Sequence, residues 1–530
     1  MARGPADRIR YDANFLANSK VRLKREFVAW LTMSRWRSEM RRHSARLRWT
    51  LATMVGAVMA VTMPAIATGA PAAQPDPASR IAWQPCTDPV FTGLQCGTMQ
   101  VPVDWSRPRE AKLTLSMVRQ PALDQANRIG ALVVNNGIGR SAIEQFRLAL
   151  KGLTHIGGAM PQRFDLIAVD PRGVGHSTPV HCEEPLKPAG VTYFPKDRAA
   201  YDRLVAHNRT LGEDCLRRNG SLVANMDMAS TARDFDAVRA ALGERQLNWY
   251  GIQYSDLLGR TYAQLFPGRL RTMVLDTAID DTVSPVAWSL QEAGAAEESF
   301  NRFTAWCATA DRCVLKGHDV AAEYDALIAR ANREPIPAAD GRLMTGVDIQ
   351  EATQYLLPIA VISWPKLAKA IVQAQSGDAT IFATAGDRTT LDPVQERAQA
   401  CADTPRRIHS FQQLSRVQRQ LAEKSPHLGG AVSSATALAG CIGWPTRPNP
   451  VHAGAPVWGA PPSLVVQSTH QAYAPHSAGD AMARQLPGSV VLSREGDDYS
   501  MFMLSQCVRD ATNRYLTELA LPAPGTTCTN

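Results

Sequence analysis

The chain has 530 residues, of which 45% are hydrophobic and 20% charged, so it has the composition and length of a globular protein with a large core. Its net charge of +8 comes from the N-terminus, because residues 1–49 hold 13 Arg and Lys against 4 Asp and Glu, and the rest holds 44 against 45. With no basic excess beyond this segment, we expect no nucleic-acid partner.

The N-terminal segment has the layout of a signal peptide. A basic stretch precedes an apolar run over residues 51–66, and the small residues in Ala67–Ala72 suit a cleavage site. We therefore expect a signal peptide over residues 40–72 and a secreted or cell-envelope protein. The run is broken by Pro64 and is shorter than the about 20 residues of a membrane span, so we expect no stable span after cleavage, and a retained anchor is the minor alternative.

The true start of the chain is Met1 or Met40, because a signal peptide that begins at Met40 would have a normal length. Residues 1–39 are then either a basic leader or a misassigned start. The Arg41–Arg42 pair leaves twin-arginine export open.

All ten cysteines follow the apparent cleavage site, which indicates disulfides formed in an oxidising compartment. Pairing neighbours along the sequence, the simplest hypothesis, joins Cys86 to Cys96, Cys182 to Cys215, Cys307 to Cys313, Cys401 to Cys441 and Cys507 to Cys528. The sequence has neither a C-x-x-C pair nor an H-E-x-x-H motif, so we expect no metal site and no cofactor.

From Gly130 onward, short apolar runs alternate with helical stretches, which is typical of an α/β fold with a mostly parallel sheet. The runs expected to be buried strands are Ala131–Asn136, Phe164–Asp170, Leu247–Tyr250, Arg271–Asp276, Ser463–Ser468 and Ser489–Arg494. The segment Ser230–Leu242 predicts a helix with Ser230 as its N-cap, because Phe235 and Val238 fall on one helical face.

Strand signals pause in the second half of the chain, which predicts a mainly helical insertion over residues 281–460. The core segments are then 80–280 and 461–530. Amphipathic helices are expected at Ala322–Ala331 and Pro365–Ala374, and their apolar faces pack on the core in the simplest interpretation.

The stretch Asn248–Gly259 predicts a strand, a sharp turn and a helix in succession. This is the arrangement of a nucleophile elbow, whose G-x-S-x-G motif places a serine at the tip. The motif positions here hold Gly251, Ile252, Gln253, Tyr254 and Ser255. Glutamine therefore stands at the tip, and serine replaces the second glycine.

These residues resemble the exported actinobacterial tripeptidyl aminopeptidases and related esterases, in which the elbow reads Y-G-x-S-Y-G-T-x-L-G. Other segments that resemble the family are Phe164–Cys182, Ser230–Gly251, Tyr262–Asp276 and Cys507–Cys528. The resemblance covers nearly all of the chain from Trp83 onward. It implies an α/β-hydrolase fold with a mostly parallel central sheet flanked by helices and a helical cap inserted between late strands.

The same resemblance places the family's catalytic Ser, Asp and His at Gln253, Gln471 and Tyr499. The amide of Gln253 cannot be deprotonated to attack a carbonyl group. An amide at Gln471 cannot act as the acid, and the phenol of Tyr499 is a poor base at neutral pH. We therefore expect a degenerate triad without serine-hydrolase activity.

The loop that would form the oxyanion hole has also changed, since the family's N-P-G-G-P-G-x-S appears as a shorter run that includes Arg140. Residues expected to line a ligand pocket are Asn136, Gly137, Arg140, Gln253, Tyr254 and Tyr499.

Several polar groups near the expected pocket have alternative roles. Ser255 is a small residue in a tight turn or a relocated nucleophile. Asp256 complements the helix dipole or acts as a general base. Asp276 ends its strand and is favoured as structural, while Asp498 and Tyr499 belong to a binding cluster or a solvated turn.

Three functions are consistent with these residues. The first is an exported pseudo-hydrolase that binds a peptide or small molecule, and we expect it to be a monomer. The second is a non-hydrolytic cyclase, isomerase or lyase that uses Tyr499, Asp256 or Asp498. The third is a serine peptidase or esterase that acts through Ser255, which requires a base within hydrogen-bonding reach.

Overall fold

The computed structural model describes residues 80–529 except 136–138, 153–155, 386–391, 406, 452–453, 455 and 500. The expected leader over residues 1–39 and the expected signal peptide over residues 40–72 lie outside the described residues. Within the described part, no helix combines the length and the apolar character needed to cross a lipid bilayer.

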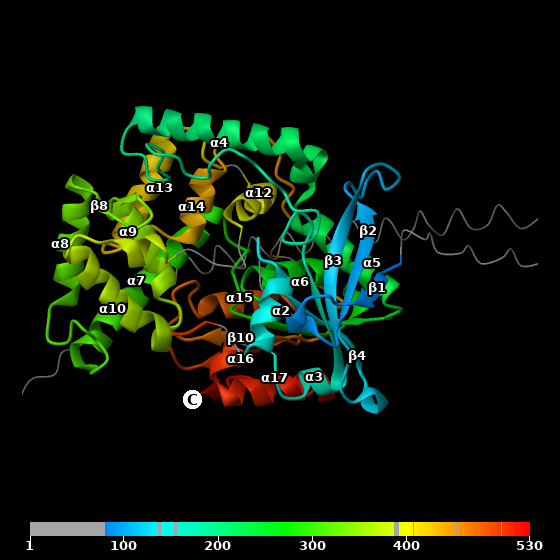
Figure 1. Ribbon diagram of the computed structural model, residues 1–530. Helices are drawn as coiled ribbons and strands as arrows, with labels where there is room; N and C mark the ends of the chain where they lie inside the picture. The colour runs from blue at the N-terminus through cyan, green and yellow to red at the C-terminus, as the bar shows by residue number, and fades with distance from the viewer. Residues whose placement is uncertain are drawn as a thin grey trace, which may run out of the picture. The chain divides into compact units, whose positions relative to one another are not determined.

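A ten-stranded sheet lies at the centre of the described residues, in the order β1-β2-β3-β5-β4-β6-β7-β10-β11-β12 (Figure 1). Its strands are β1 (Ala82–Pro85), β2 (Gln95–Pro102), β3 (Lys112–Gln120), β4 (Gly130–Asn135), β5 (Phe164–Val169), β6 (Leu247–Ile252), β7 (Leu270–Asp276), β10 (Leu464–Ser468), β11 (Val490–Arg494) and β12 (Thr527–Cys528). Strands β1, β2 and β3 pair antiparallel, and the pairs from β5 to β12 are parallel. This sheet, with helices between its strands, confirms the expected α/β-hydrolase fold.

The six expected strands are present as β4, β5, β6, β7, β10 and β11, with small differences at their ends. Each was recognisable as a continuous apolar run, because strands of a parallel sheet are covered by helices on both faces. The antiparallel strands β1 to β3 were not anticipated. Strand β2 alternates buried and exposed side chains, as expected at a partly solvated edge.

The core helices connect these strands. They are α2 (Ala142–Leu150), α3 (Met160–Arg163), α5 (Met228–Ala241), α6 (Tyr254–Leu265), α15 (Ser477–Gln485), α16 (Met501–Leu504) and α17 (Gln506–Glu518). The expected N-cap of α5 was wrong: Asp227 is the N-cap and accepts a hydrogen bond from the backbone N–H of Ser230. The carboxylate reaches this donor three residues on and also accepts from the Ser230 hydroxyl, so the helix starts earlier.

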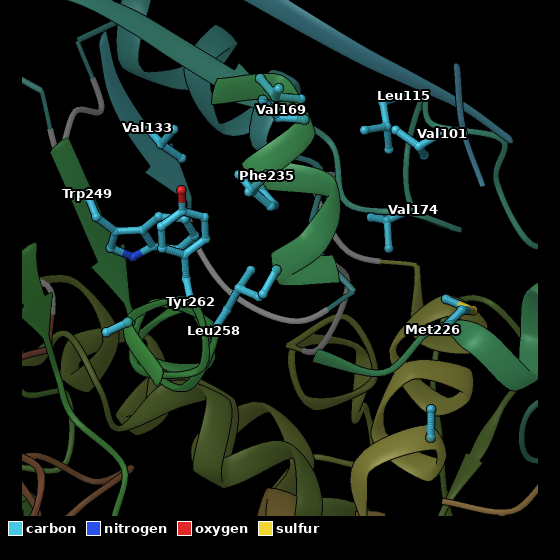
Figure 2. Packing of buried hydrophobic residues seen from close by; sticks show 14 of the residues in the cluster. Val101, Leu115, Val133, Val169, Val174, Met226, Phe235, Trp249, Leu258 and Tyr262 are labelled. Atoms are coloured by element: carbon cyan, nitrogen blue, oxygen red, sulfur yellow. The ribbon is translucent and has the colours of Figure 1, made fainter. Parts of the chain in front are cut away.

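The two faces of β6 separate two hydrophobic cores. Trp249 packs between Phe235 of α5 and Tyr262 of α6 on one face (Figure 2). Tyr250, the next residue, points to the opposite face and contacts Phe502 of α16. This alternation fixes β6, and with it the turn that follows, from both sides.

Two insertions stand above the carboxyl ends of the strands. The expected one, between β7 and β10, contains α7 (Pro285–Thr309), α8 (Val320–Arg333), β8 (Ile336–Pro337), β9 (Leu343–Met344), α9 (Gly346–Thr353), α10 (Ala360–Gln375), α11 (Thr380–Ala383), α12 (Pro393–Asp403), α13 (Phe411–Lys424) and α14 (Ser433–Gly440). The helices expected at Ala322–Ala331 and Pro365–Ala374 form parts of α8 and α10. Their apolar faces pack mainly in a separate core of the insertion, around Phe300 and Trp364, and not on the sheet.

The second insertion, between β5 and α5, was not anticipated. It contains α4 (Arg198–Asn219), which crosses the top of the molecule in Figure 1 above α13 and α14. Tyr201 and Leu204 of α4 pack in one cluster with Leu414 of α13 and Leu438 of α14. The two insertions therefore form one cap over the sheet.

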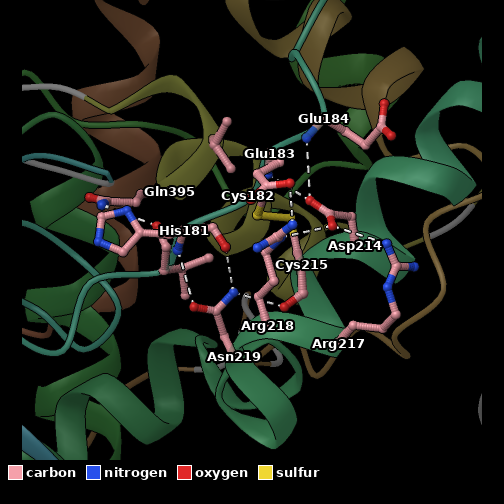
Figure 3. Close-up of a disulfide and its surroundings, with 12 residues drawn as sticks. His181, Cys182, Glu183, Glu184, Asp214, Cys215, Arg217, Arg218, Asn219 and Gln395 are labelled. Carbon is pink, nitrogen blue, oxygen red and sulfur yellow. Dashed lines mark hydrogen bonds and ion pairs between the residues drawn. A yellow bond between two sulfur atoms is a disulfide. The ribbon is translucent and has the colours of Figure 1, made fainter.

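Five disulfides join the described cysteines in the pairing of nearest neighbours, and none of the ten is free. The bond between Cys182 and Cys215 ties the start of the second insertion to α4 (Figure 3). Next to it, Asp214 accepts hydrogen bonds from the backbone of Glu183 and from Arg218. These links stabilise the second insertion internally, and the disulfides fit a protein of an oxidising compartment.

A buried ion pair joins the segment after β5 to α5, and its loss should lower the stability of the protein. Arg172, fully buried after β5, binds Asp234 of α5 at 2.6 Å and donates to the carbonyl oxygens of Pro102 and Val103. Replacing Asp234 by Ala leaves a buried guanidinium unpaired, so we expect Asp234→Ala to lower the free energy of unfolding by about 3–5 kcal/mol in urea titrations.

The matched control is Asp202→Ala, which breaks an exposed pair with Arg198 on α4. We expect a loss of at most about 1 kcal/mol there. Equal losses in the two variants would contradict a central role for the buried pair.

Candidate functional site

The turn between β6 and α6 has the backbone of a nucleophile elbow. Gln253 stands at its tip with φ 57° and ψ −122°, a region that side-chain-bearing residues rarely adopt. Its N–H donates to the carbonyl oxygen of Asp276 at 3.0 Å, and its carbonyl accepts from the N–H of Asp256 at 2.8 Å. The strained turn therefore persists with glutamine in place of a nucleophile.

Two glycines allow the strand and helix of the elbow to approach closely. A Cβ atom on Gly251 would lie 2.8 Å from Nε1 of Trp249, and one on Gly259 would lie 2.7 Å from the same atom. Neither position has room for a side chain, so both glycines of this helix–strand contact are required by packing.

A pocket of about 570 Å³, its opening to solvent included, lies in front of the Gln253 tip. Core and cap both contribute to its wall, which is formed by Arg140, Gln253, Tyr254, Thr277, Ile279, Trp288, Glu292, Tyr355, Glu396, Ser433, Tyr473 and Ala474. Of the residues expected to line it, Arg140, Gln253 and Tyr254 do so, while Asn136 and Gly137 lie outside the described residues. Four aromatic side chains and few charges make this a small, specific cavity.

Gln471, at the expected acid position, is not part of the pocket wall. It is buried, its Nε2 donates to the carbonyl oxygen of Ala474 at 2.6 Å, and its Oε1 accepts from the N–H of Tyr473 at 2.9 Å. The side chain closes its own loop with one donor and one acceptor. A carboxylate could supply only the acceptor, so this loop is built for an amide.

Tyr499 does not line the pocket, contrary to expectation. Its ring packs edge-on against Tyr473 at 5.5 Å between centroids, and its N–H donates to the carbonyl oxygen of Pro358 in the cap. The pocket wall ends at Tyr473, which stands between Tyr499 and the cavity. Asp498 is likewise engaged: it accepts from the N–H of Ala360 at 2.7 Å and pairs with Arg494 at 2.8 Å.

Ser255 does not line the main pocket. Its hydroxyl is buried without a hydrogen-bond partner and lies 3.0 Å from where a Cβ of Gly251 would be. It borders a smaller hollow that also contains Asn135 and Gln399. None of the histidines in the described part lines this hollow or the main pocket, so no described imidazole can activate Ser255.

Two acids are buried under the elbow. Asp276 accepts hydrogen bonds from Tyr250, Thr277, Met501 and Phe502, yet burial raises its pKa to about 6. Burial, and then the charge of Asp276, raise the pKa of Asp256 well above its usual value. Neither oxygen of Asp256 makes a hydrogen bond of normal geometry, and the backbone of Asp276 offers only a weak contact. Burial therefore disfavours the charged form of Asp256, which has no exposed surface through which to meet a substrate.

Sequence reasoning missed two acids of the pocket wall, Glu396 on α12 and Glu292 on α7, and the second is buried. Glu292 lines the pocket, accepts hydrogen bonds from the backbone N–H and hydroxyl of Ser434 at the start of α14, and has a pKa raised by burial to about 7. Burial, Glu292 and Glu396 together raise the pKa of Tyr254 well above its usual value. The only sequence signal was the spacing of Trp288 and Glu292, which places both on one face of α7.

Gly139 belongs to the loop that would form the oxyanion hole, and its backbone N–H is already engaged within the protein. Its N–H donates to Oε1 of Gln399 at 2.6 Å, and a Cβ on this glycine would lie 2.7 Å from the backbone of Glu396. Helix α12 therefore packs directly against the loop, so the Gly139 amide is committed to protein and not to a developing oxyanion. In the described residues no cluster of three or more metal-binding side chains occurs.

Comparisons with known proteins identify relatives over most of the chain. A family model described as "TAP-like protein" matches residues 426–528. "Carboxylesterase B" of Mycobacterium tuberculosis is 30% identical over 87% of this chain and 91% of its own length. "Serine protease Hip1" of the same species is 28% identical (91% and 97%), and "Tripeptidyl aminopeptidase" of Streptomyces lividans is 27% identical (92% and 98%).

The bonding of Gln471 predicts that a carboxylate at this position is destabilising. Gln471→Glu removes the donor to Ala474 and buries a charge beside a carbonyl oxygen, so we expect the free energy of unfolding to fall by about 1–3 kcal/mol at neutral pH. The control is Gln413→Glu on α13, where the exposed side chain only accepts a hydrogen bond, from the N–H of His409. Equal shifts of the urea midpoint in both variants would refute the role assigned to the amide.

The buried acid Asp256 predicts a pH dependence of stability. Its raised pKa keeps it protonated in the folded state while the unfolded state ionises above about pH 4, so the free energy of unfolding falls as the pH rises. Asp256→Asn cannot ionise, and we expect a smaller fall between about pH 5 and about pH 8 than in the parent. The part of the decrease in the free energy of unfolding that remains in Asp256→Asn comes from Asp276 and Glu292, because burial raises the pKa of both.

The measurement is urea unfolding at both pH values. The control is the exposed Asp202→Asn, whose free energy of unfolding should fall with pH as much as that of the parent. A fall in Asp256→Asn as steep as in the parent would mean that Asp256 is ionised in the folded protein.

Proposed function

The chain belongs to the tripeptidyl-aminopeptidase-like family of α/β-hydrolases, and we propose that it is a member that binds a peptide or small molecule without hydrolysing it. The observation that carries the proposal is the intact elbow with Gln253 at its tip. An amide at the position of the attacking oxygen can donate and accept hydrogen bonds but cannot form an acyl-enzyme.

The other two triad positions support the same function. Gln471 uses both ends of its amide within its own loop, and Tyr499 lies behind Tyr473. The Gly139 amide is bound to Gln399. A serine placed at the tip would therefore still lack an activating base and this oxyanion donor.

The pocket retains what a binding site needs. Trp288, Tyr254 and Tyr473 offer apolar surface with polar edges, and Gln253 offers a donor and an acceptor at the base. The five disulfides fit an extracellular site of action, and we extend the proposal to a monomer exported by the signal peptide over residues 40–72.

A non-hydrolytic enzyme is the second candidate, and Glu292 favours it. A carboxyl group that lines the pocket with a pKa of about 7 has the properties of a general acid or base. The earlier candidates for this role fit less well, because Asp256 is sealed below the elbow and Asp498 is bonded to the cap. A hydrolase that acts through Ser255 finds no support in the surroundings of its hydroxyl.

Labelling with a fluorophosphonate separates binding from serine hydrolysis. We expect no stoichiometric labelling of the purified chain or of Gln253→Ser, because no described histidine lines the pocket or the hollow beside Ser255. The control Ser255→Ala should behave like the parent. Labelling of the parent that disappears in Ser255→Ala would establish the hydrolase instead.

Ligands are then sought by thermal shift with oligopeptides and small metabolites, since a ligand that binds only the folded state raises the melting temperature. We expect Gln253→Met, which keeps the volume and removes the hydrogen bonds, to weaken the shift, and the exposed Gln100→Met to leave it unchanged. Turnover of a hit, lost in Glu292→Gln, would favour the second candidate.

A further inference from the structure

We propose that the two loops after β10 and β11 act as a clamp that fastens the cap over the pocket and controls access to it. The clamp comprises Thr469–His470 and Glu495–Tyr499. Its second segment ends at Tyr499, the position where the resemblance places the family's base. This inference concerns access and goes beyond the proposed function, because it holds whether the pocket binds or transforms its ligand.

The second loop of the clamp holds two cap helices. Asp498 accepts from the N-terminal N–H of α10, at Ala360, and the N–H of Tyr499 donates to Pro358 at 3.1 Å. Asp497 forms an ion pair with Arg302 of α7. Three consecutive residues therefore bind the cap, and Asp498 is more than nine-tenths buried.

The first loop fastens the second one and reaches α7 as well. The N–H of His470 donates to the carbonyl oxygen of Gly496 at 3.0 Å, and the N–H of Gly496 donates to the Thr469 hydroxyl at 3.1 Å. Nδ1 of His470 lies 2.6 Å from Glu298 of α7. The two loops thus form one unit with contacts to both cap helices.

An arginine locks this unit internally. Arg494, at the end of β11, passes over Gly496 to reach Asp498 at 2.8 Å. A Cβ on Gly496 would lie 2.1 Å from Nη1 of Arg494, and its φ of 151° also disfavours other residues. Glycine at this position is therefore required for the arginine to hold Asp498 in place.

The clamp and the pocket share helix α7. Its residues Arg302 and Glu298 bind the clamp, while Trp288 and Glu292 form the pocket wall. Tyr499 also supports the wall from behind through Tyr473. Release of the clamp therefore frees the cap side of the pocket, which connects these contacts to ligand access.

Access is measured with a single thiol at the elbow tip. All ten native cysteines are in disulfides, so Gln253→Cys introduces the one free thiol of the mature chain, and its reaction with Ellman's reagent reports opening of the pocket. In this background we expect Asp498→Ala and Gly496→Ala each to raise the reaction rate by about tenfold or more, since hydrogen bonds to charged groups are lost. Arg302→Met, at a partly exposed position that the fold should tolerate, is expected to give a smaller rise.

The control Asp202→Ala breaks an exposed ion pair on α4 and should leave the rate unchanged. Hydrogen exchange of the Ala360 amide verifies in each variant that the clamp has opened. Faster exchange at Ala360 with thiol rates within about twofold of the parent would overturn the proposal, because the clamp would then open without admitting the reagent. If Asp498→Ala does not fold, Gly496→Ala and Arg302→Met decide by the same comparison.

Discussion

The backbone of Gln253 is the constraint on which the site depends. A non-glycine residue at φ 57° costs free energy, and the surrounding structure must hold it in place. The hydrogen bond to Asp276 and the close packing of Gly251 and Gly259 against Trp249 do so. The same contacts join β6, β7 and α6, so the strained tip cannot relax without disturbing the centre of the sheet. This explains how the elbow geometry persists with a residue that cannot attack a carbonyl.

The residues at the other two expected triad positions, Gln471 and Tyr499, are held by contacts within the protein. Gln471 closes a loop that needs a donor and an acceptor, and the ring of Tyr499 packs against Tyr473 while its N–H donates to Pro358 of the insertion. Replacing Gln471 by an acid would remove the hydrogen bond that its amide donates to Ala474. Substitution at Gln253 alone would therefore leave the contacts of both loops as they are.

The parts of the fold that the sequence could predict are those with a local physical cause. Parallel strands read as apolar runs because both faces are buried, and five cysteine pairs close in sequence are also close in space. The N-cap of α5 was misplaced because Asp227 and Ser230 both have capping side chains, and only geometry shows which accepts. Glu292 and the position of Tyr499 behind Tyr473 depend on how the cap docks, which no local pattern encodes.

The groups around the elbow determine what a ligand in the pocket would meet. Burial raises the pKa of Asp256 and the pKa of Tyr254 well above their usual values, which disfavours a charge on either group. A ligand in the pocket would meet aromatic surface, the amide of Gln253 and the charged side chains of Arg140, Glu292 and Glu396. Binding in such a cavity is selective through shape and a few hydrogen bonds. The acids that reach the ligand space are therefore Glu292 and Glu396, whereas Asp256 and Asp276 do not line the pocket.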